Sequence, residues 1–277
     1  SPPAPTAASS AFAALRRTDA PSILFDGRGG HDGAWPCRLA IEPRPTPLGG
    51  IGDVEALMVR RRAAGGPGGT GVALLASYEG GLTAFEVDAL IAFPEGSAPV
   101  AIGPDNVVER TAAILSRPLP PARRGATLVS DAARTSLARE AYVRAVARLQ
   151  ELIASGDLYQ ANLTQRFEAR FDGDAWDLYR AIGAATPAPR SAYVEAPGWA
   201  LASMSPEVFV DVSAEGVAET RPIKGTRPRG SNKDSEDDAA RELLASEKDR
   251  AELVMIVDVL RNDLGRIAET GSVTVDD

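Results

Sequence analysis

Apolar side chains recur at the spacing of a helix between residues 135 and 156. Ser136 or Thr135 can cap the start of this helix, and Gly156 is placed to end it. The apolar positions that share one face are Tyr142, Val146, Leu149 and Ile153. This pattern predicts an amphipathic helix.

Three further stretches also have helical character. Residues 174–185 predict a helix of ordinary length, and Val54 to Ala64 predict a short one with Asp53 as its N-cap. From about Ser235 to Ala268 the pattern predicts one long helix. Its SEDD start places acidic residues where the helix dipole favours them, and ELVMIVDVL supplies the section expected to be buried.

Short apolar runs bounded by turn residues predict strands. They fall at residues 21–27, 35–43, 72–81, 159–170, 191–197, 199–205, 207–213 and 216–224. The run at 72–81 is expected to be a buried strand. Strands and helices come in blocks, which favours an α+β fold with helices packed outside antiparallel sheets.

The domain organisation follows from shifts in composition. Residues 1–20 are a loose Ala/Pro-rich tail without the layout of a secretory signal. Residues 118–131 have the composition of a linker. We therefore expect an N-terminal part over residues 21–117 and a second domain over residues 132–277.

Composition and charge exclude several classes of function. The formal net charge of −8 argues against a surface dedicated to nucleic acid, and no apolar stretch approaches the roughly 20 residues of a membrane span. The single cysteine, Cys37, excludes an internal disulfide, and with the single histidine, His31, it leaves no His/Cys metal cluster. A reducing cytoplasm is the default location.

Lys224 is the first candidate for chemistry. It leaves a predicted strand in RPIKGTRPRG, where partial burial would lower the pKa of its amine and make it a nucleophile or a base. Gly225 lets another molecule approach the backbone, and Thr226 adds a hydroxyl. The alternative is an exposed loop lysine in a basic patch, formed with Arg221, Arg227 and Arg229.

Three carboxylates are the other candidates. Glu207 would face the Lys224 strand if the two strands form a hairpin, and it could then protonate a departing hydroxyl. Asp249 and Glu252 are three residues apart, so they share one face of a helix and can hold Mg²⁺. The alternatives are a solvated Glu207 and ordinary ion pairs on the helix, with Lys248, Arg250 or Arg261.

Several motifs, taken together, resemble the chorismate-utilising enzymes and, among them, component I of aminodeoxychorismate synthases. They are GDLYQANLTQRF, SPEVF, ETRPIKGTRPRG and LLASEKDRAELVMIVDVLRNDLGR. The resemblance is strong from about residue 135 to the end and loose over residues 20–105. It implies the fold of component I of anthranilate synthase, with antiparallel sheets packed face to face and helices outside.

The resemblance also implies an activity. Related anthranilate and isochorismate synthases typically carry Ala where Lys224 stands, and isochorismate and salicylate synthases typically carry a Lys base where Gln160 stands. The presence of Lys224 and Gln160 in this chain therefore favours amination of chorismate at C4. Glu207 would be the general acid and Lys224 the nucleophile at C2. Mg²⁺ held by Asp249 and Glu252 would bind the ring carboxylate, and Gln160, Gly225 and Thr226 would contact the substrate.

Partners and destination follow from the same resemblance. The product would be 4-amino-4-deoxychorismate, in para-aminobenzoate and folate biosynthesis. Cys37 lacks the surroundings of a glutaminase nucleophile, so a separate glutamine amidotransferase subunit is expected to supply ammonia. Relatives also hold tryptophan in the N-terminal part, as an inhibitor or a structural ligand.

Two other interpretations stay open. The chain could be component I of an anthranilate synthase, which forms 2-aminobenzoate, or a non-catalytic module that binds an amino acid. Family members also continue past the RNDLGR segment into a GSITGAPK-like segment and another metal-ligating Glu pair, whereas this chain ends at Asp277. We therefore expect a C-terminally truncated fold, and an inactive protein when the 277-residue chain is isolated.

Overall fold

The structure is a computed structural model that describes most of the chain in two compact units. One unit holds the described residues within 118–185, and the other holds those within 5–117 and 186–277. The described residues are 7–17, 19–27, 37–64, 71–94, 97–117, 127–129, 133–213, 215–228, 230 and 232–276. The predicted linker therefore lies largely outside the described residues, and so does His31.

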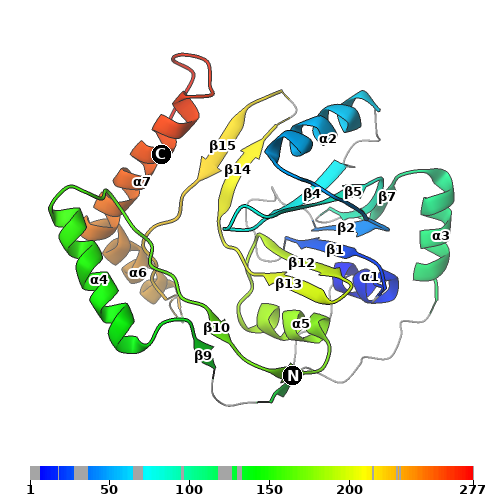
Figure 1. Cartoon of the computed structure of the whole chain (residues 1–277), viewed down its shortest axis with the longest axis horizontal. Helices are drawn as coiled ribbons and strands as arrows, with labels where there is room; N and C mark the ends of the chain where they lie inside the picture. The colour runs from blue at the N-terminus through cyan, green and yellow to red at the C-terminus, as the bar shows by residue number, and fades with distance from the viewer. Residues whose placement is uncertain are drawn as a thin grey trace. The chain divides into compact units, whose positions relative to one another are not determined.

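The larger unit is built on a six-stranded sheet in which every neighbouring pair is antiparallel (Figure 1). Its strands, in spatial order, are β13 (Trp199–Ser203), β12 (Ser191–Ala196), β1 (Ser22–Asp26), β2 (Cys37–Ile41), β6 (Ala89–Phe93) and β7 (Val100–Ile102). One pairing joins β1 to β12, with Leu24 opposite Tyr193. Sequence segments far apart thus lie side by side in one sheet.

A second sheet of three strands shares its core with the first. Its order is β3 (Arg44–Thr46), β5 (Leu82–Val87) and β4 (Gly71–Ala76). Side chains from both sheets form one buried cluster, which contains Ile23, Ala40, Phe85, Val87, Leu90 and Val194. The expectation that residues 72–81 form a buried strand is wrong in its burial, because β4 is an edge strand and Leu74 is exposed.

Helices pack against these sheets. The helices α1 (Ala7–Leu15) and α3 (Asp105–Leu115) contact each other, and Phe12 of α1 meets Tyr193 of β12 edge to face, with ring centroids 5.5 Å apart. The helix α2 (Ile51–Ala63) buries Leu57 and begins before the predicted Val54. Asp53 lies in its first turn instead of capping it, and accepts a hydrogen bond from the Gly49 N–H at 2.6 Å.

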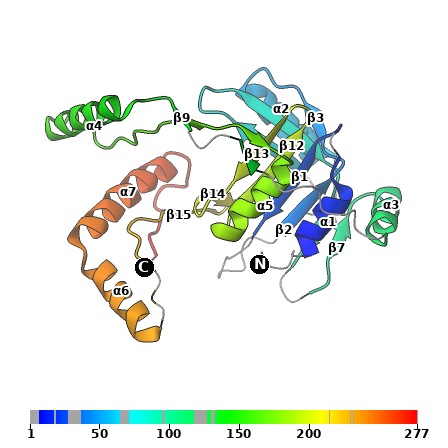
Figure 2. The same ribbon diagram turned by 90° about the horizontal axis from the view of Figure 1, so that it is seen from below.

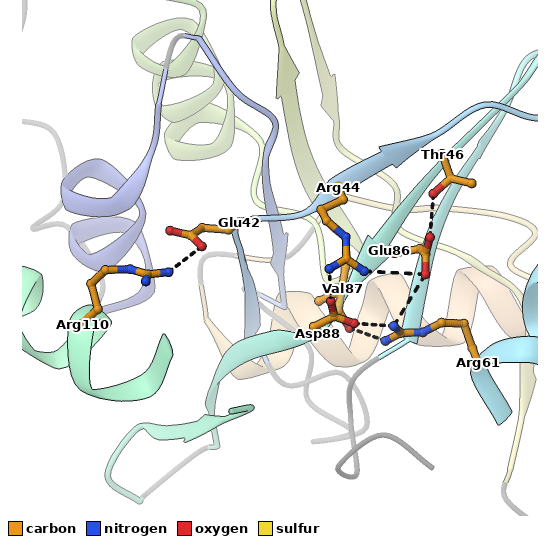
Figure 3. A network of polar contacts seen from close by, with 8 residues as sticks. All are labelled: Glu42, Arg44, Thr46, Arg61, Glu86, Val87, Asp88 and Arg110. Carbon is orange, nitrogen blue, oxygen red and sulfur yellow. Dashed lines mark hydrogen bonds and ion pairs between the residues drawn. The ribbon is translucent and has the colours of Figure 1, made fainter. Parts of the chain in front are cut away.

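A group of ion pairs joins α2 to the three-stranded sheet (Figure 3). Arg61 of α2 pairs with Asp88 and donates to the Val87 carbonyl at 3.0 Å. Arg44 of β3 pairs with the other oxygen of Asp88 at 2.6 Å. The Arg61 side chain is 18% exposed, so these contacts are partly shielded from water.

The last part of the larger unit forms a hairpin and two helices. The hairpin pairs β14 (Val208–Val212) with β15 (Ala218–Arg221). The single long helix expected from about Ser235 is wrong: α6 (Lys233–Ala245) and α7 (Glu247–Gly265) are separate helices that meet at an angle, as Figure 2 shows. All of α7 is described and none of its residues is buried, so the predicted buried section is also wrong.

The smaller unit has two helices, α4 (Arg139–Ala154) and α5 (Ala175–Ala185), both as predicted. Neither predicted cap acts on α4, because the N-cap is Ala138 and the Ser136 hydroxyl accepts from the Arg166 N–H. Two short ladders pair β9 (Arg134–Thr135) with β10 (Phe167–Glu168) and β8 (Thr127–Leu128) with β11 (Phe171–Asp172). Outside β10, the strand predicted over residues 159–170 is not formed, although the carbonyls of Arg166 and Arg170 accept backbone hydrogen bonds from Ser136 and Val129.

The fold is therefore α+β, as predicted, with mixed helices and antiparallel sheets. In the part of the chain that the structure describes, no helix combines the length and the apolar character needed to cross a membrane.

Candidate active site

The β14–β15 hairpin brings Glu207 to the segment that contains Lys224. Val208 lies opposite Arg221 in the ladder, so the residues just outside this pair, Glu207 and Ile223, come together. The Ile223 N–H donates a hydrogen bond to Glu207 Oε1 at 2.9 Å. The hairpin on which the prediction for Glu207 depended is present, and the carboxylate is bonded to the residue that precedes Lys224.

Gly225 brings the same segment against the two C-terminal helices. Its φ of +69° lies in the left-handed region, which glycine adopts without strain. A Cβ at this position would lie 2.7 Å from Leu243 Cδ1 and 2.9 Å from Asp249 Cβ. Only a residue without a side chain allows the backbone to approach α6 and α7 so closely.

Lys224 therefore lies between two anchored neighbours. Ile223 is bonded to Glu207, and Gly225 is in contact with Asp249. The Lys224 side chain is half-buried, and among the described residues its amine has neither a hydrogen bond nor an ion pair. The backbone on either side of Lys224 thus contacts a carboxylate side chain, and an amine without a partner of its own can react with an incoming molecule.

Arg227 neutralises part of the basic stretch that follows Lys224. Its Nε pairs with Glu242 Oε1 of α6 at 2.7 Å, and its Nη2 pairs with Asp249 Oδ2 of α7 at 3.0 Å. Arg221 pairs with Glu219. The alternative of a free basic patch is therefore not supported for these two arginines, and Arg229 lies outside the described residues.

Asp249 lies in the first turn of α7, where Ser246 is the N-cap. The Asp249 N–H donates to Ser246 Oγ at 3.3 Å. This bond gives an acceptor to one of the first-turn N–H groups that have none within the helix. The Ser246 hydroxyl and, to a smaller extent, Arg227 lower the pKa of the Asp249 carboxyl. Asp249 is thus ionised, and its partner is Arg227 instead of a residue of its own helix.

Glu252 lies on the same face of α7, less than one turn after Asp249, and is half-buried. No group of three or more His, Cys, Asp or Glu residues capable of holding a metal ion occurs in the described ranges. Two carboxylates nevertheless suit Mg²⁺, which commonly keeps several waters and takes its remaining ligands from one or two carboxylates and the substrate. Asp249 and Glu252 are carboxylates of the kind that could supply such ligands, and one oxygen of Asp249 is already held by Arg227.

The structure adds little for the two remaining predicted residues. Thr226 is exposed, and its carbonyl accepts from Arg227 Nη1 at 3.0 Å. Gln160 belongs to the smaller unit, where it is half-buried in the extended segment between α4 and β10. The role of both residues in substrate binding stays a prediction.

Arg227 is the member of this group that the sequence did not single out as functional. Its position in RPIKGTRPRG places it three residues after Lys224, but nothing local shows that its partners lie on two later helices. Cys37 lies elsewhere, at the start of β2, where it donates to Asp26 Oδ1 at 3.4 Å.

Comparison with known sequences gives consistent matches. The family described as chorismate binding enzyme matches residues 98–277. The chain is 44% identical over 147 residues to aminodeoxychorismate synthase component 1 of Klebsiella aerogenes, a match covering 53% of this chain and 32% of the relative. It is 41% identical over 143 residues to anthranilate synthase component 1 of Aquifex aeolicus, covering 52% and 29%. The matched region thus spans about a third of these relatives.

Solved structures share the fold. Anthranilate synthase component I from Streptococcus pneumoniae superposes with a TM-score of 0.61 at 24% identity, covering 76% of this chain and 53% of that chain. The menaquinone-specific isochorismate synthase MenF from Escherichia coli gives a TM-score of 0.61 at 12% identity, covering 91% and 59%. At these identities the likeness concerns the fold alone.

Proposed function

Because the chain belongs to the chorismate binding enzyme family, we propose that it binds chorismate beside Lys224 and aminates it at C4, giving 4-amino-4-deoxychorismate. One observation carries this proposal. A three-residue segment joins Glu207 through the Ile223 N–H to Asp249 through Gly225, and Lys224 is the middle residue of that segment. The similarity to aminodeoxychorismate synthase component 1 supports the choice of reaction.

Each residue of the group has a role in the proposed reaction. The Lys224 amine adds to C2 of the ring as the ring double bonds shift, and Glu207 protonates the C4 hydroxyl so that it leaves as water. The new amine then returns a proton to Glu207. Ammonia attacks C4, the double bonds shift back, and Lys224 leaves with that proton.

Charge matching explains how a dianionic substrate would enter an acidic protein. Mg²⁺ held by Glu252, and by Asp249 directly or through water, would neutralise the ring carboxylate of chorismate. Glu252 is half-buried, which would keep an ion bound to it partly out of bulk water. Its neighbour Asp249 is fixed by Arg227 and does not need to move when the substrate arrives.

Ammonia would come from a separate glutamine amidotransferase. The sequence around Cys37 lacks the character of a glutaminase nucleophile. The word component in the names of the relatives agrees with a second subunit. The product would then serve para-aminobenzoate and folate biosynthesis in the cytoplasm.

Anthranilate synthesis is the second candidate, because a relative of that name is 41% identical over the same part of the chain. Lys224 opposes it, since a covalent amine at C2 directs ammonia to C4. If the chain converts chorismate in the presence of Mg²⁺ and ammonium at raised pH, the product distinguishes C4 amination from anthranilate synthesis. Formation of fluorescent 2-aminobenzoate without a downstream lyase would contradict the C4 assignment.

Binding can be tested without turnover, by calorimetric titration of the chain with chorismate in the presence and absence of Mg²⁺. We expect binding that Mg²⁺ strengthens about tenfold or more, because two carboxylates and a dianion repel each other without it. Glu252→Gln should remove most of this dependence. Glu247→Gln is the matched control, an exposed acid in the first turn of the same helix.

Two results would count against the proposal. One is the failure of chorismate to bind with Mg²⁺ present. The other is an equal loss of Mg²⁺ dependence in Glu252→Gln and Glu247→Gln, which would show a general charge effect of the helix instead of a site at Glu252.

A further inference from the structure

Arg227 connects the lysine segment to both C-terminal helices. Its guanidinium makes three contacts with three different parts of the larger unit: Glu242 on α6 at 2.7 Å, Asp249 on α7 at 3.0 Å and the Thr226 carbonyl at 3.0 Å. Because the side chain starts three residues after Lys224, holding the guanidinium also holds the backbone that leads to the lysine.

We propose that Arg227 is a positioning residue that fastens the Lys224–Thr226 segment to the junction of α6 and α7 and thereby fixes the position of the Lys224 amine. This inference rests on the proposed function of Lys224 and deepens it. Arg227 itself is not assigned any contact with substrate.

Burial shows which contact of Arg227 matters most. The Asp249 side chain is 16% exposed and that of Arg227 is 25% exposed, whereas Glu242 is 68% exposed. Exposed ion pairs contribute little, while removing one partner of a shielded pair leaves a charge that is poorly solvated. The Asp249 contact is therefore the main anchor and the Glu242 contact is secondary.

Close packing at Gly225 makes an anchor necessary. The backbone there lies so near Leu243 and Asp249 that even a methyl group would overlap them. A segment in such contact keeps its place only if something holds it against the helices, since residues 222–228 form no helix or strand of their own. Arg227 supplies this attachment directly beside the contact.

The chemistry of the group explains why it is an arginine. The planar guanidinium offers N–H donors in several fixed directions, so one side chain can bind a carboxylate from each helix and a carbonyl at once. A lysine ammonium is a point charge on a flexible stem and cannot reproduce this fork. Arg227→Lys should therefore keep the charge and lose much of the positioning.

The chain offers a selective readout, because it contains three lysines in total. Lys224 is half-buried, whereas Lys233 and Lys248 are exposed. The rate at which each is acylated by an amine-directed reagent can be mapped by mass spectrometry at several pH values. Lys233 and Lys248 then act as references. Amide hydrogen exchange within residues 222–228, where Ile223 to Arg227 carry the N–H groups, reports on the backbone.

In Arg227→Met we expect Lys224 to be acylated at least about fivefold faster than in the parent chain, and residues 222–228 to exchange about tenfold faster. Arg227→Lys should reverse less than half of the increase in either rate. Asp249→Asn should reproduce the Arg227→Met result. Glu242→Gln should leave both the acylation rate and the exchange rate within about twofold of the parent chain. Arg241→Met is the matched control, since Arg241 pairs with Asp238 on the exposed face of α6.

The proposal is overturned if Arg227→Met leaves the acylation of Lys224 and the exchange of residues 222–228 within about twofold of the parent chain. It is also overturned if both rates in Arg227→Lys equal those of the parent chain, because a positive charge alone would then be enough to position the segment. If Arg227→Met does not fold, Asp249→Asn and Arg227→Lys carry the same test. None of these measurements uses chorismate, so a failure here is distinct from a failure of the proposed function.

Discussion

At the scale of single residues, Gly225 shows how local geometry and tertiary packing combine. Its left-handed φ alone would favour glycine, but several other glycines of the chain share that property. At Gly225 a Cβ would also overlap Leu243 and Asp249, a double constraint that it shares with Gly103, where a Cβ would overlap Ala89. The residue is therefore constrained twice, once by its backbone and once by its neighbours.

Gly225→Ala should lower the free energy of unfolding by about 2–4 kcal/mol, the sum of a backbone penalty of about 1 kcal/mol and the cost of overpacking. Gly198→Ala is the control: φ there is +88° and a Cβ would meet nothing within 4 Å, so it should lose only the backbone part. Urea unfolding of both variants measures the difference. Equal losses would show that the contact with α6 and α7 contributes nothing.

The sequence names candidate residues for the site, but it does not give their contacts. Lys224, Glu207 and Glu252 stand in recognisable motifs, and the hairpin that pairs Glu207 with Ile223 follows from alternating strands and turns. The partner of Asp249 could not be predicted, because Arg227 reaches it only after the chain has turned back on itself. Ion pairs between distant segments leave no periodic signal in the sequence.

At the scale of elements, Ser246 divides what the sequence predicted to be one helix. The polar and acidic residues on either side have good helix propensity, so pattern alone favours continuation. Ser246 instead adopts an extended backbone with φ of −73° and ψ of 102°, and its hydroxyl caps α7. Capping by a serine competes with helix continuation, and here the cap prevails.

Ser246→Ala should therefore cost about 1 kcal/mol of stability through loss of the cap. Ser246→Asn, which also caps well, should retain most of the stability of the parent chain. Thermal or urea unfolding measures both. The account of this helix boundary is wrong if Ser246→Ala is as stable as the parent, since the two helices would then not depend on the hydroxyl.

A second prediction at this scale concerns α2 and its attachment to the three-stranded sheet. Arg61→Met should lower the free energy of unfolding by about 1–2 kcal/mol, because it leaves Asp88 and the Val87 carbonyl without this donor. Arg60→Met and Arg62→Met are matched controls, both exposed and on the same helix. Similar losses in all three would mean that helix propensity, and not the ion pairs of Figure 3, explains the effect.

The same ion pairs predict a dependence on pH. Arg61, followed by Arg44, lowers the pKa of the Asp88 carboxyl, so the folded state favours its ionised form. The stabilisation is fully present above the ordinary carboxyl pKa of about 4 and is lost as the pH falls through the lowered folded value. Asp88→Asn should thus be less stable than the parent at pH 7, and the gap should close as the pH falls below about 4. A gap that stays constant down to about pH 3 would contradict this.

At the scale of the whole chain, the class of fold was predictable and the strand order was not. Blocks of strands and helices with short turns indicated α+β with antiparallel pairing, which the sheets confirm. The pairing of β1 with β12 had no signal, because it depends on a long-range closure that alternation cannot encode. The exposed apolar side chains of α7, such as Val254, show a similar limit of prediction from sequence. Hydrophobic periodicity predicts which face of a helix is apolar, but not which element covers that face.

The central claim is that chorismate binds against the Lys224 amine, and protection from acylation tests it most directly. Chorismate with Mg²⁺ should slow the acylation of Lys224 by at least about fivefold at saturation, while Lys233 and Lys248 react at unchanged rates because they are exposed. Shikimate serves as a control for a ring carboxylate that lacks the enolpyruvyl group. If chorismate binds but all three lysines are acylated at the same rates as without it, Lys224 does not meet the substrate and the account is wrong.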